Sequence, residues 1–394
     1  MKKLLYVAML FFAVAITCGN TEKAAAKTYK AGKFKYQYKN TKKGVWITKI
    51  TPLSSKGISK LDIPDKIKGK KVVKLGSTGD EKAFDLFEDV RDLFGVVIED
   101  PEGDGIYTIS NPQIYKRVAK IKKIKIPSSV VSITPKCFIY LQDGKEINIP
   151  KGVEKNVVYQ FTKPKWKKLK ISSKNKKYKV KNSCLLSKSG KTLYGIVYKK
   201  KRVVVPETVT KIESGPYPEG KESGAAIHRY AFSGCETLMI HKNVKKIECF
   251  DSASSLKVEV DSANMYYASK DGSVYNKKNG ELILLYRTGD VYHIPDGVKV
   301  MSYTYGVLGS GGGVKKIIIP ASVEKIRDFS YCYVGKDAIC VCYGKEPPVL
   351  MDKFTSAAIN LTVYIPKGCK AAYESAWKVG GEYQDRIKLT FIEQ

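Results

Sequence analysis

Short segments that alternate apolar and polar residues recur along the chain, and several end directly before a proline. The residues before Pro127 (Lys-Ile-Lys-Ile) and those of 256–260 (Leu-Lys-Val-Glu-Val) are examples of the alternation. Alternation with a period of two predicts short strands that bury one face. Proline has no N–H to give to a sheet, so it ends each strand. The pattern predicts a β-rich chain of many short strands.

The prolines belong to one repeated phrase, in which an aliphatic residue precedes Pro and a Val often stands three residues after it, with an aliphatic three residues later still. Its occurrences are Ile63-Pro64, Ile126-Pro127, Ile149-Pro150, Val205-Pro206, Ile294-Pro295, Ile319-Pro320 and Ile365-Pro366, with His241 in the place of Pro after Ile240. Several intervals are close to one or two units of about 23–28 residues, a period typical of solenoid repeats. One such unit cannot cover its own apolar face, so we expect neighbouring units to stack.

A longer repetition supports this interpretation. Residues 175–212 align with residues 264–301 without a gap, so that Asn175 matches Asn264 and Tyr178 matches Tyr267. In each copy a strand-rich insert precedes the next proline phrase. The second insert contains Asp271-Gly272 and Asn279-Gly280, which favour tight turns, so we predict a β-hairpin in both copies.

These residues resemble the BspA-like leucine-rich-repeat family of secreted and surface bacterial proteins. The resemblance rests on the proline phrases, on Ala231-Phe232-x-x-Cys235, on the insert at Asn264–Gly272 and on an ending similar to the family's closing unit at Val363–Lys378. It implies a β-rich α/β solenoid, a leucine-rich-repeat array of short parallel strands with irregular or helical turns and β-hairpin inserts. It also implies adhesion-type binding and no catalytic residues.

The domain organisation follows from these signals. Lys2 and Lys3 precede an apolar run of signal-peptide length, and Ala24-Ala25-Ala26 offers a cleavage site after Ala26. Lipid attachment at Cys18 is the alternative, although the residues before Cys18 fit it poorly. We predict the following divisions: a signal peptide over 1–26, an opening unit over 27–76, an acidic irregular insert over 77–116, repeats over 117–362 with hairpin inserts at about 175–205 and 264–294, and a closing unit over 363–394.

Charge is large and unevenly distributed. The formal net charge is +32, while residues 80–104 hold ten acidic and two basic side chains. The basic clusters are Lys116–Lys125, Lys163–Lys181 and Lys199–Arg202. They are interpreted either as an attraction to polyanions or as solvated faces that keep a β-rich array soluble. For the first case the candidate ligand-binding residues are Lys163, Lys165, Trp166, Lys167, Lys168, Lys170, Lys199, Lys200, Lys201 and Arg202.

Motifs that would carry chemistry are not found in the sequence. It contains three histidines and neither a nucleophile elbow nor a phosphate loop, so we expect no enzyme, cofactor or metal site. The cysteines at repeated positions, such as Cys235 and Cys332, favour buried free thiols over a disulfide framework.

The function expected is a secreted or cell-surface protein that binds a protein or an anionic glycan, without a dedicated nucleic-acid partner and without a transmembrane segment in the mature chain. The alternatives are a lipid-anchored envelope protein that uses its basic face for polyanions, and the scaffold of an envelope hydrolase.

Overall fold

A computed structural model describes residues 27–56, 58–76, 98–99, 108–109, 112–134, 137–138, 145–154, 166–213, 231–232, 234–248, 256–286, 289–301, 314–326, 334–351, 359–378 and 387–394. The predicted signal segment with Cys18 and the cleavage site after Ala26 lies outside the described residues. So does most of the predicted acidic insert over 77–116.

Most strands that lead into the proline phrases pair in parallel with the corresponding strands of neighbouring repeats and form the first ladder, in three sheets. Register places Leu61, Ile124, Ile147 and Leu169 side by side, each at most 2% exposed. The strands are β4 (Lys60–Asp62), β9 (Lys123–Lys125), β11 (Glu146–Ile149) and β12 (Lys168–Ile171); then β16 (Lys200–Val204), β18 (Cys235–Ile240) and β20 (Lys257–Val260); then β24 (Val291–His293), β26 (Val314–Ile319), β28 (Val334–Cys342), β30 (Ile359–Ile365) and β31 (Ile387–Glu393).

Shorter strands form a second parallel ladder, and several of them carry the last aliphatic residue of the phrase. Ile212 and Ile247 are paired in register, and both share an apolar cluster with Val203 and Leu238 of the first ladder. The core therefore lies between the two ladders. The strands are β6 (Lys70–Leu75) and β10 (Ser132–Ile133); β15 (Thr192–Ile196), β17 (Lys211–Ile212) and β19 (Lys246–Ile247); and β25 (Val300–Met301), β27 (Lys325–Ile326) and β29 (Val349–Leu350).

The spacing within the phrase has a simple hydrogen-bonding basis. The carbonyl of the proline accepts the N–H of the valine three residues later, with N–O distances of 3.1 Å at Pro127–Val130 and 2.9 Å at Pro206–Val209. This bond closes a β-turn between the first and the second ladder. The turns after the prolines were expected to be either irregular or helical, and these turns are not helical.

Three antiparallel meanders begin three blocks of the chain, which run over 27–174, 175–263 and 264–394. The meanders are β1 (Lys27–Ala31), β2 (Phe34–Thr41) and β3 (Gly44–Pro52); β13 (Tyr178–Lys181), β14 (Cys184–Ser187) and β15; and β21 (Tyr267–Lys270), β22 (Ser273–Asn276) and β23 (Leu282–Leu284). β3 and β15 pair in parallel with strands of the second ladder. In the third meander Glu281, directly before β23, makes the equivalent contact through a parallel bridge to Val300.

Both predicted hairpins are thus confirmed, and the second turns at Asp271-Gly272 with φ values of 52° and 88°, as a type I′ turn requires. The meander of the opening unit was not expected from the sequence.

The remaining elements are few. β5 (Lys66–Ile67) pairs with β6, and β7 (Ile98–Glu99) pairs with β8 (Thr108–Ile109). Helix α1 (Pro112–Ala119) begins inside the stretch predicted to be irregular, which corrects that boundary: proline is favoured in the first turn of a helix. Helix α4 (Lys370–Ala376) packs Tyr373 into the C-terminal core.

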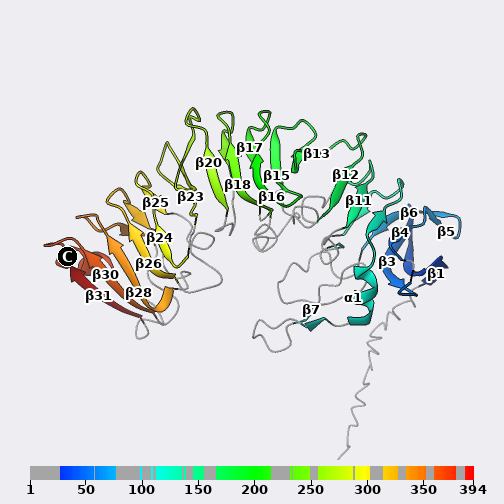
Figure 1. Cartoon of the computed structure of the whole chain (residues 1–394), viewed down its shortest axis with the longest axis horizontal. Helices are drawn as coiled ribbons and strands as arrows, with labels where there is room; N and C mark the ends of the chain where they lie inside the picture. The colour runs from blue at the N-terminus through cyan, green and yellow to red at the C-terminus, as the bar shows by residue number, and fades with distance from the viewer. Residues whose placement is uncertain are drawn as a thin grey trace, which may run out of the picture.

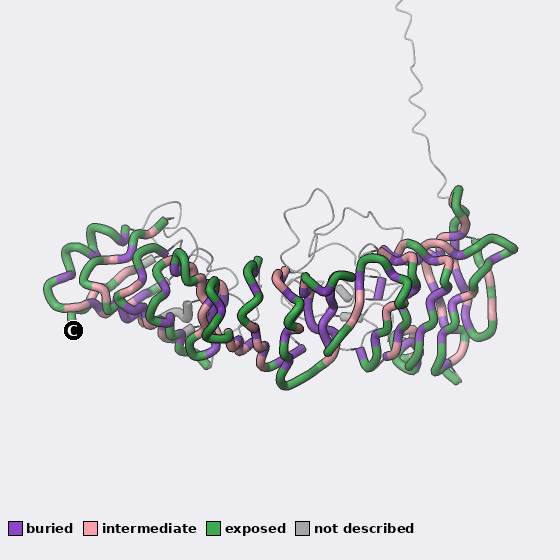
Figure 2. The backbone as a smooth tube through the Cα atoms, turned by 90° about the horizontal axis from the view of Figure 1, so that it is seen from above, coloured by how far each residue is buried: buried purple, intermediate pink, exposed green. Residues whose placement is uncertain are grey.

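The three blocks follow one another in chain order around an arc, from β1 at one end to β31 at the other (Figure 1). Buried and exposed positions alternate along the tube from block to block (Figure 2). The prediction of a β-rich chain of short parallel strands is confirmed, and three apolar clusters correspond closely to the three blocks.

Two buried asparagines fasten the second and third meanders to the preceding repeats. Asn264, 0% exposed, donates to the carbonyls of His241 and Val244 and accepts the N–H groups of Tyr266 and Tyr267 at 2.8–3.0 Å. Asn175 makes the same four contacts one block earlier. The alignment of these two asparagines in the sequence therefore reflects a shared structural role.

Replacing Asn264 by Ala should lower the free energy of unfolding by about 2–3 kcal/mol, because it leaves buried backbone groups without partners. Asn148→Ala, at an exposed position on β11, is the matched control and should change it by less than about 0.5 kcal/mol. Urea unfolding of both variants measures this. Equal midpoints for the two variants would contradict the role given to Asn264.

The six described cysteines are buried and are free thiols in the structure: Cys137, Cys184, Cys235, Cys340, Cys342 and Cys369. Burial raises the pKa of Cys184 to about 12, with a small contribution from Cys235. Burial also raises the pKa of Cys235 to about 12. Both thiols thus remain protonated at neutral pH, and the thiolate is the reactive form.

Iodoacetamide at pH 8 should therefore alkylate Cys184 and Cys235 at least about a hundredfold more slowly in the native protein than in urea. Peptide mass spectrometry at successive times measures each site separately. Native labelling at the denatured rate would show that these thiols are accessible.

Candidate functional site

The predicted ligand-binding cations lie on both sides of a break in the first ladder, where β12 ends one sheet and β16 begins the next. Lys167, Lys168 and Lys170 are exposed at β12, and Lys199–Lys201 are exposed at β16. Lys163 and Lys165 lie outside the described residues.

One tyrosine joins the two sides of this break. The Leu169 N–H donates to the Tyr198 hydroxyl oxygen at 2.9 Å, and that hydroxyl donates to the Leu169 carbonyl at 2.6 Å. The phenol thus takes the place that a neighbouring strand would occupy on β12. Burial raises the pKa of Tyr198, and the hydrogen bond with Leu169 lowers it by less, so the hydroxyl keeps the proton that it donates. The two lysine segments are therefore held next to each other.

Trp166 requires a correction. The sequence placed it among the basic residues as a possible surface contact, but it is 3% exposed and belongs to the N-terminal apolar cluster. Burying a large indole stabilises the core more than leaving it in water would. Trp166 therefore has a packing role in the core.

Arg202 is exposed but already paired. Its Nη2 lies 3.3 Å from Oε2 of Glu259, across the sheet formed by β16, β18 and β20. Its Nε also lies 2.7 Å from the Met239 sulfur. Part of its charge is thus balanced within the chain.

Lysines of the neighbouring strands extend the charged surface. Register places Lys123, Glu146 and Lys168 in one row, and Lys125, Asn148 and Lys170 in the next. The basic face comprises Lys123, Lys125, Lys167, Lys168, Lys170, Lys199, Lys200 and Lys201. These lysines have no carboxylate partner within 4 Å among the residues that the structure describes.

The same side of the ladder is different at the C-terminal end. There the corresponding row begins at His293 and continues through the apolar residues Ile318, Val341, Tyr364 and Ile392. The basic face is therefore a local property of the first two blocks and does not follow from the repeat itself.

Other chemistry finds little support in the described part of the chain. Within it, no three His, Cys, Asp or Glu side chains are grouped so that they could hold a metal ion. No described helix has the length and apolar character needed to cross a membrane. His241, in the proline position of its repeat, has Nε2 2.8 Å from the Pro206 carbonyl and Nδ1 accepting the Asn243 N–H, which is a turn-forming role.

Replacing Tyr198 by Phe removes the hydroxyl that bridges Leu169 and should speed hydrogen exchange of the Leu169 amide by about tenfold or more. Tyr194→Phe is the matched control, since the Tyr194 hydroxyl has no hydrogen bond among the described residues. Exchange followed by mass spectrometry measures both. Unchanged exchange in Tyr198→Phe would show that the hydroxyl does not close this edge.

Comparison with solved structures finds bacterial proteins at low identity. The pneumococcal vaccine antigen PcpA is 14% identical over 94% of this chain and 99% of that chain, with a TM-score of 0.34. A leucine-rich repeat protein from Bacteroides ovatus is 16% identical over 93% and 78%, with a TM-score of 0.31. One from Eubacterium ventriosum is 16% identical over 88% and 80%, with a TM-score of 0.28. Curated protein sequences give no match.

The family comparison is more specific. The model of the "BspA type Leucine rich repeat region (6 copies)" matches residues 107–217. This stretch contains three of the proline phrases, much of the first two blocks, and Tyr198 with most of the basic face. Residues 107–217 of this chain are therefore similar to a leucine-rich repeat region of the BspA type.

Proposed function

We propose that this protein is an exported leucine-rich-repeat protein that binds an anionic polymer, most simply an anionic glycan, through the basic face. The three blocks form one continuous solenoid in this proposal, and the partner lies along its side. Export is supported by the signal-peptide pattern of the first 26 residues and by the resemblance to surface proteins.

The observation that carries the proposal is the register of the lysines. Parallel strands lie about 4.8 Å apart, so Lys123 and Lys168 stand two strand spacings apart in one row, and Lys125 and Lys170 repeat that spacing in the next. The strands fix the stems of these side chains. The result is two rows in which lysines recur at every second strand, with Glu146 between them in the first row and Asn148 in the second, a spacing that suits a partner with repeating charges.

The distribution of ion pairs also favours binding on this side. Several lysines of the second and third blocks, outside the basic face, are paired with acids of the same or the neighbouring repeat, as in Lys211–Glu248 at 3.0 Å and Lys299–Glu324 at 2.8 Å. The described lysines of the basic face have no such partners. A charge that is left unbalanced within the chain is available to a polyanion, and its effect weakens as salt rises.

The double variant Lys168→Glu/Lys170→Glu should weaken binding to dextran sulfate by about tenfold or more at about 50 mM salt. Lys242→Glu/Lys245→Glu makes the same charge change on exposed lysines outside the basic face and should weaken it by less than about threefold. Biolayer interferometry with the full chain, with neutral dextran as the reference, measures both. Equal losses in the two double variants would mean that net charge alone acts, and the proposed face would be wrong.

A further inference from the structure

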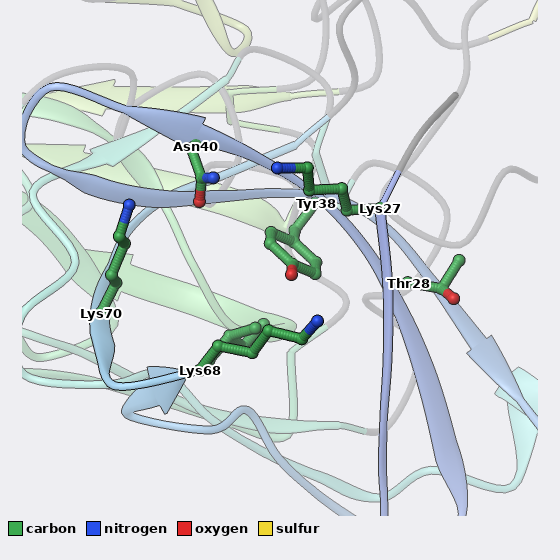
Figure 3. A pocket seen from close by; sticks show the side chains of 7 residues that line it. Lys27, Thr28, Tyr38, Asn40, Lys68 and Lys70 are labelled. Atoms are coloured by element: carbon green, nitrogen blue, oxygen red, sulfur yellow. The ribbon is translucent and has the colours of Figure 1, made fainter. Parts of the chain in front are cut away.

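A hollow of about 370 Å³ lies at the N-terminal end of the chain, away from the residues of the basic face. It opens between the β1–β2 pair on one side and the β5–β6 hairpin on the other (Figure 3). Its lining residues are Lys27, Thr28, Tyr38, Asn40, Ile67, Lys68 and Lys70. In Figure 3 the side chains of Lys27, Asn40, Lys68 and Lys70 surround the ring of Tyr38.

Strand register explains how these residues come together. Lys27 pairs with Tyr38 across β1 and β2, and Asn40 stands two residues after Tyr38, so the three side chains share one face of the meander. Ile67 ends β5 and is 0% exposed, and Tyr38 is 2% exposed. The hollow therefore has an apolar base and a polar, cationic rim.

The Tyr38 hydroxyl is the first sign that the hollow takes a ligand. It lines the hollow although the residue is almost fully buried, and it has no hydrogen-bond partner among the described residues. The hydroxyl faces the open hollow and so is not among the buried polar atoms that lack a partner. The hydroxyls of Tyr36 and Tyr373, by contrast, donate to the backbone carbonyls of Asp62 and Gly344. The Tyr38 hydroxyl is free to donate to a bound group instead.

The second sign is the backbone at Lys68. Lys68 and Gly69 are the central residues of the β5–β6 turn, with φ values of 47° and 79°. Both values are positive, as in a type I′ turn, for which Asn-Gly is the favoured pair. A lysine is strained in this conformation, and such strain concentrates at ligand-binding positions. Here it places an ammonium group at the rim of the hollow.

The third sign is the uncompensated charge. Lys27, Lys68 and Lys70 have no ion pair with any described carboxylate, whereas exposed lysines elsewhere do, as in Lys270–Asp296 and Lys315–Asp290 at 2.8 Å. Three ammonium groups at the rim, with a phenol and an amide as further donors, are the groups that bind the oxygens of an oxyanion. Cleavage after Ala26, as predicted, would add the α-amino group of Lys27.

We propose that this hollow binds a phosphate or sulfate group carried on a sugar unit. The oxyanion contacts Lys27, Lys68 and Lys70 and accepts from Tyr38 and Asn40, while the apolar base formed by Ile67 and the Tyr38 ring covers the carbon face of the sugar. The volume, near the lower end of the range for small-molecule sites, suits one monosaccharide. This site is independent of the basic face.

Isothermal titration calorimetry with the full chain tests the proposal, using glucose 6-phosphate, glucose 6-sulfate and glucose as probes. We expect saturable binding of at least one charged sugar and none of glucose. The tighter of the two charged sugars identifies which oxyanion the site prefers. No saturable binding of either charged sugar would overturn the proposal.

Three variants locate the binding. Lys68→Asn should raise the dissociation constant by about tenfold or more, because it removes an ammonium group. It should leave the melting temperature equal or higher, because Asn tolerates a positive φ better than Lys does. Tyr38→Phe should weaken it by about threefold to tenfold. Lys200→Met, on the basic face, should leave it unchanged. A loss with Lys200→Met equal to that with Lys68→Asn would place the sugar elsewhere. Because these probes are monosaccharides, failure here leaves the dextran sulfate result on the basic face unaffected.

Discussion

Each repeat of this chain exposes an apolar face that only the next repeat can cover, and the rest of the structure depends on this constraint. Leu61, Ile124, Ile147 and Leu169 illustrate it, since each is buried only because its neighbours in the row stand in register. Parallel hydrogen bonding sets the spacing, and the proline turn returns the chain to the second ladder. The stability of the array therefore depends on the strand register, because a slip by one residue would expose every buried row at once.

Residues on the opposite side of each strand are free of this constraint and can serve binding. In the first block they are largely lysines, in the second block they are mixed, and in the third block the row through Ile318 and Tyr364 is apolar. One scaffold thus presents two chemically different surfaces along its length. The hollow beside Tyr38 adds a third kind of site, in which the opening meander and a strained turn enclose a small volume.

The periodic part of the structure could be predicted from the sequence, because a repeated contact leaves a repeated pattern. The strands before Pro127 and Pro320 and the hairpin at Asp271-Gly272 follow from short-range rules. The burial of Trp166 could not be inferred from its lysine-rich surroundings. The hollow was also missed, because Tyr38 and Lys68 belong to different elements of one non-repeating unit and meet only through tertiary packing. The pairing of Tyr198 with Leu169 is a single contact and leaves no periodic signal.

Where the first ladder is interrupted, the next block supplies hydrogen-bond partners to the last strand. This has a consequence for how such a chain can change in length. The Tyr198 hydroxyl satisfies the edge of β12, and in the next block Ser269 Oγ accepts the Val260 N–H of β20 while the Gly272 carbonyl accepts that of Val258. Each block thus seals the edge left by its predecessor. The two closures use residues that are not equivalent, since the position 89 residues before Ser269 holds Val180. A block that was duplicated or lost would therefore bring together an edge and a meander that do not match, so the number of blocks is expected to resist change.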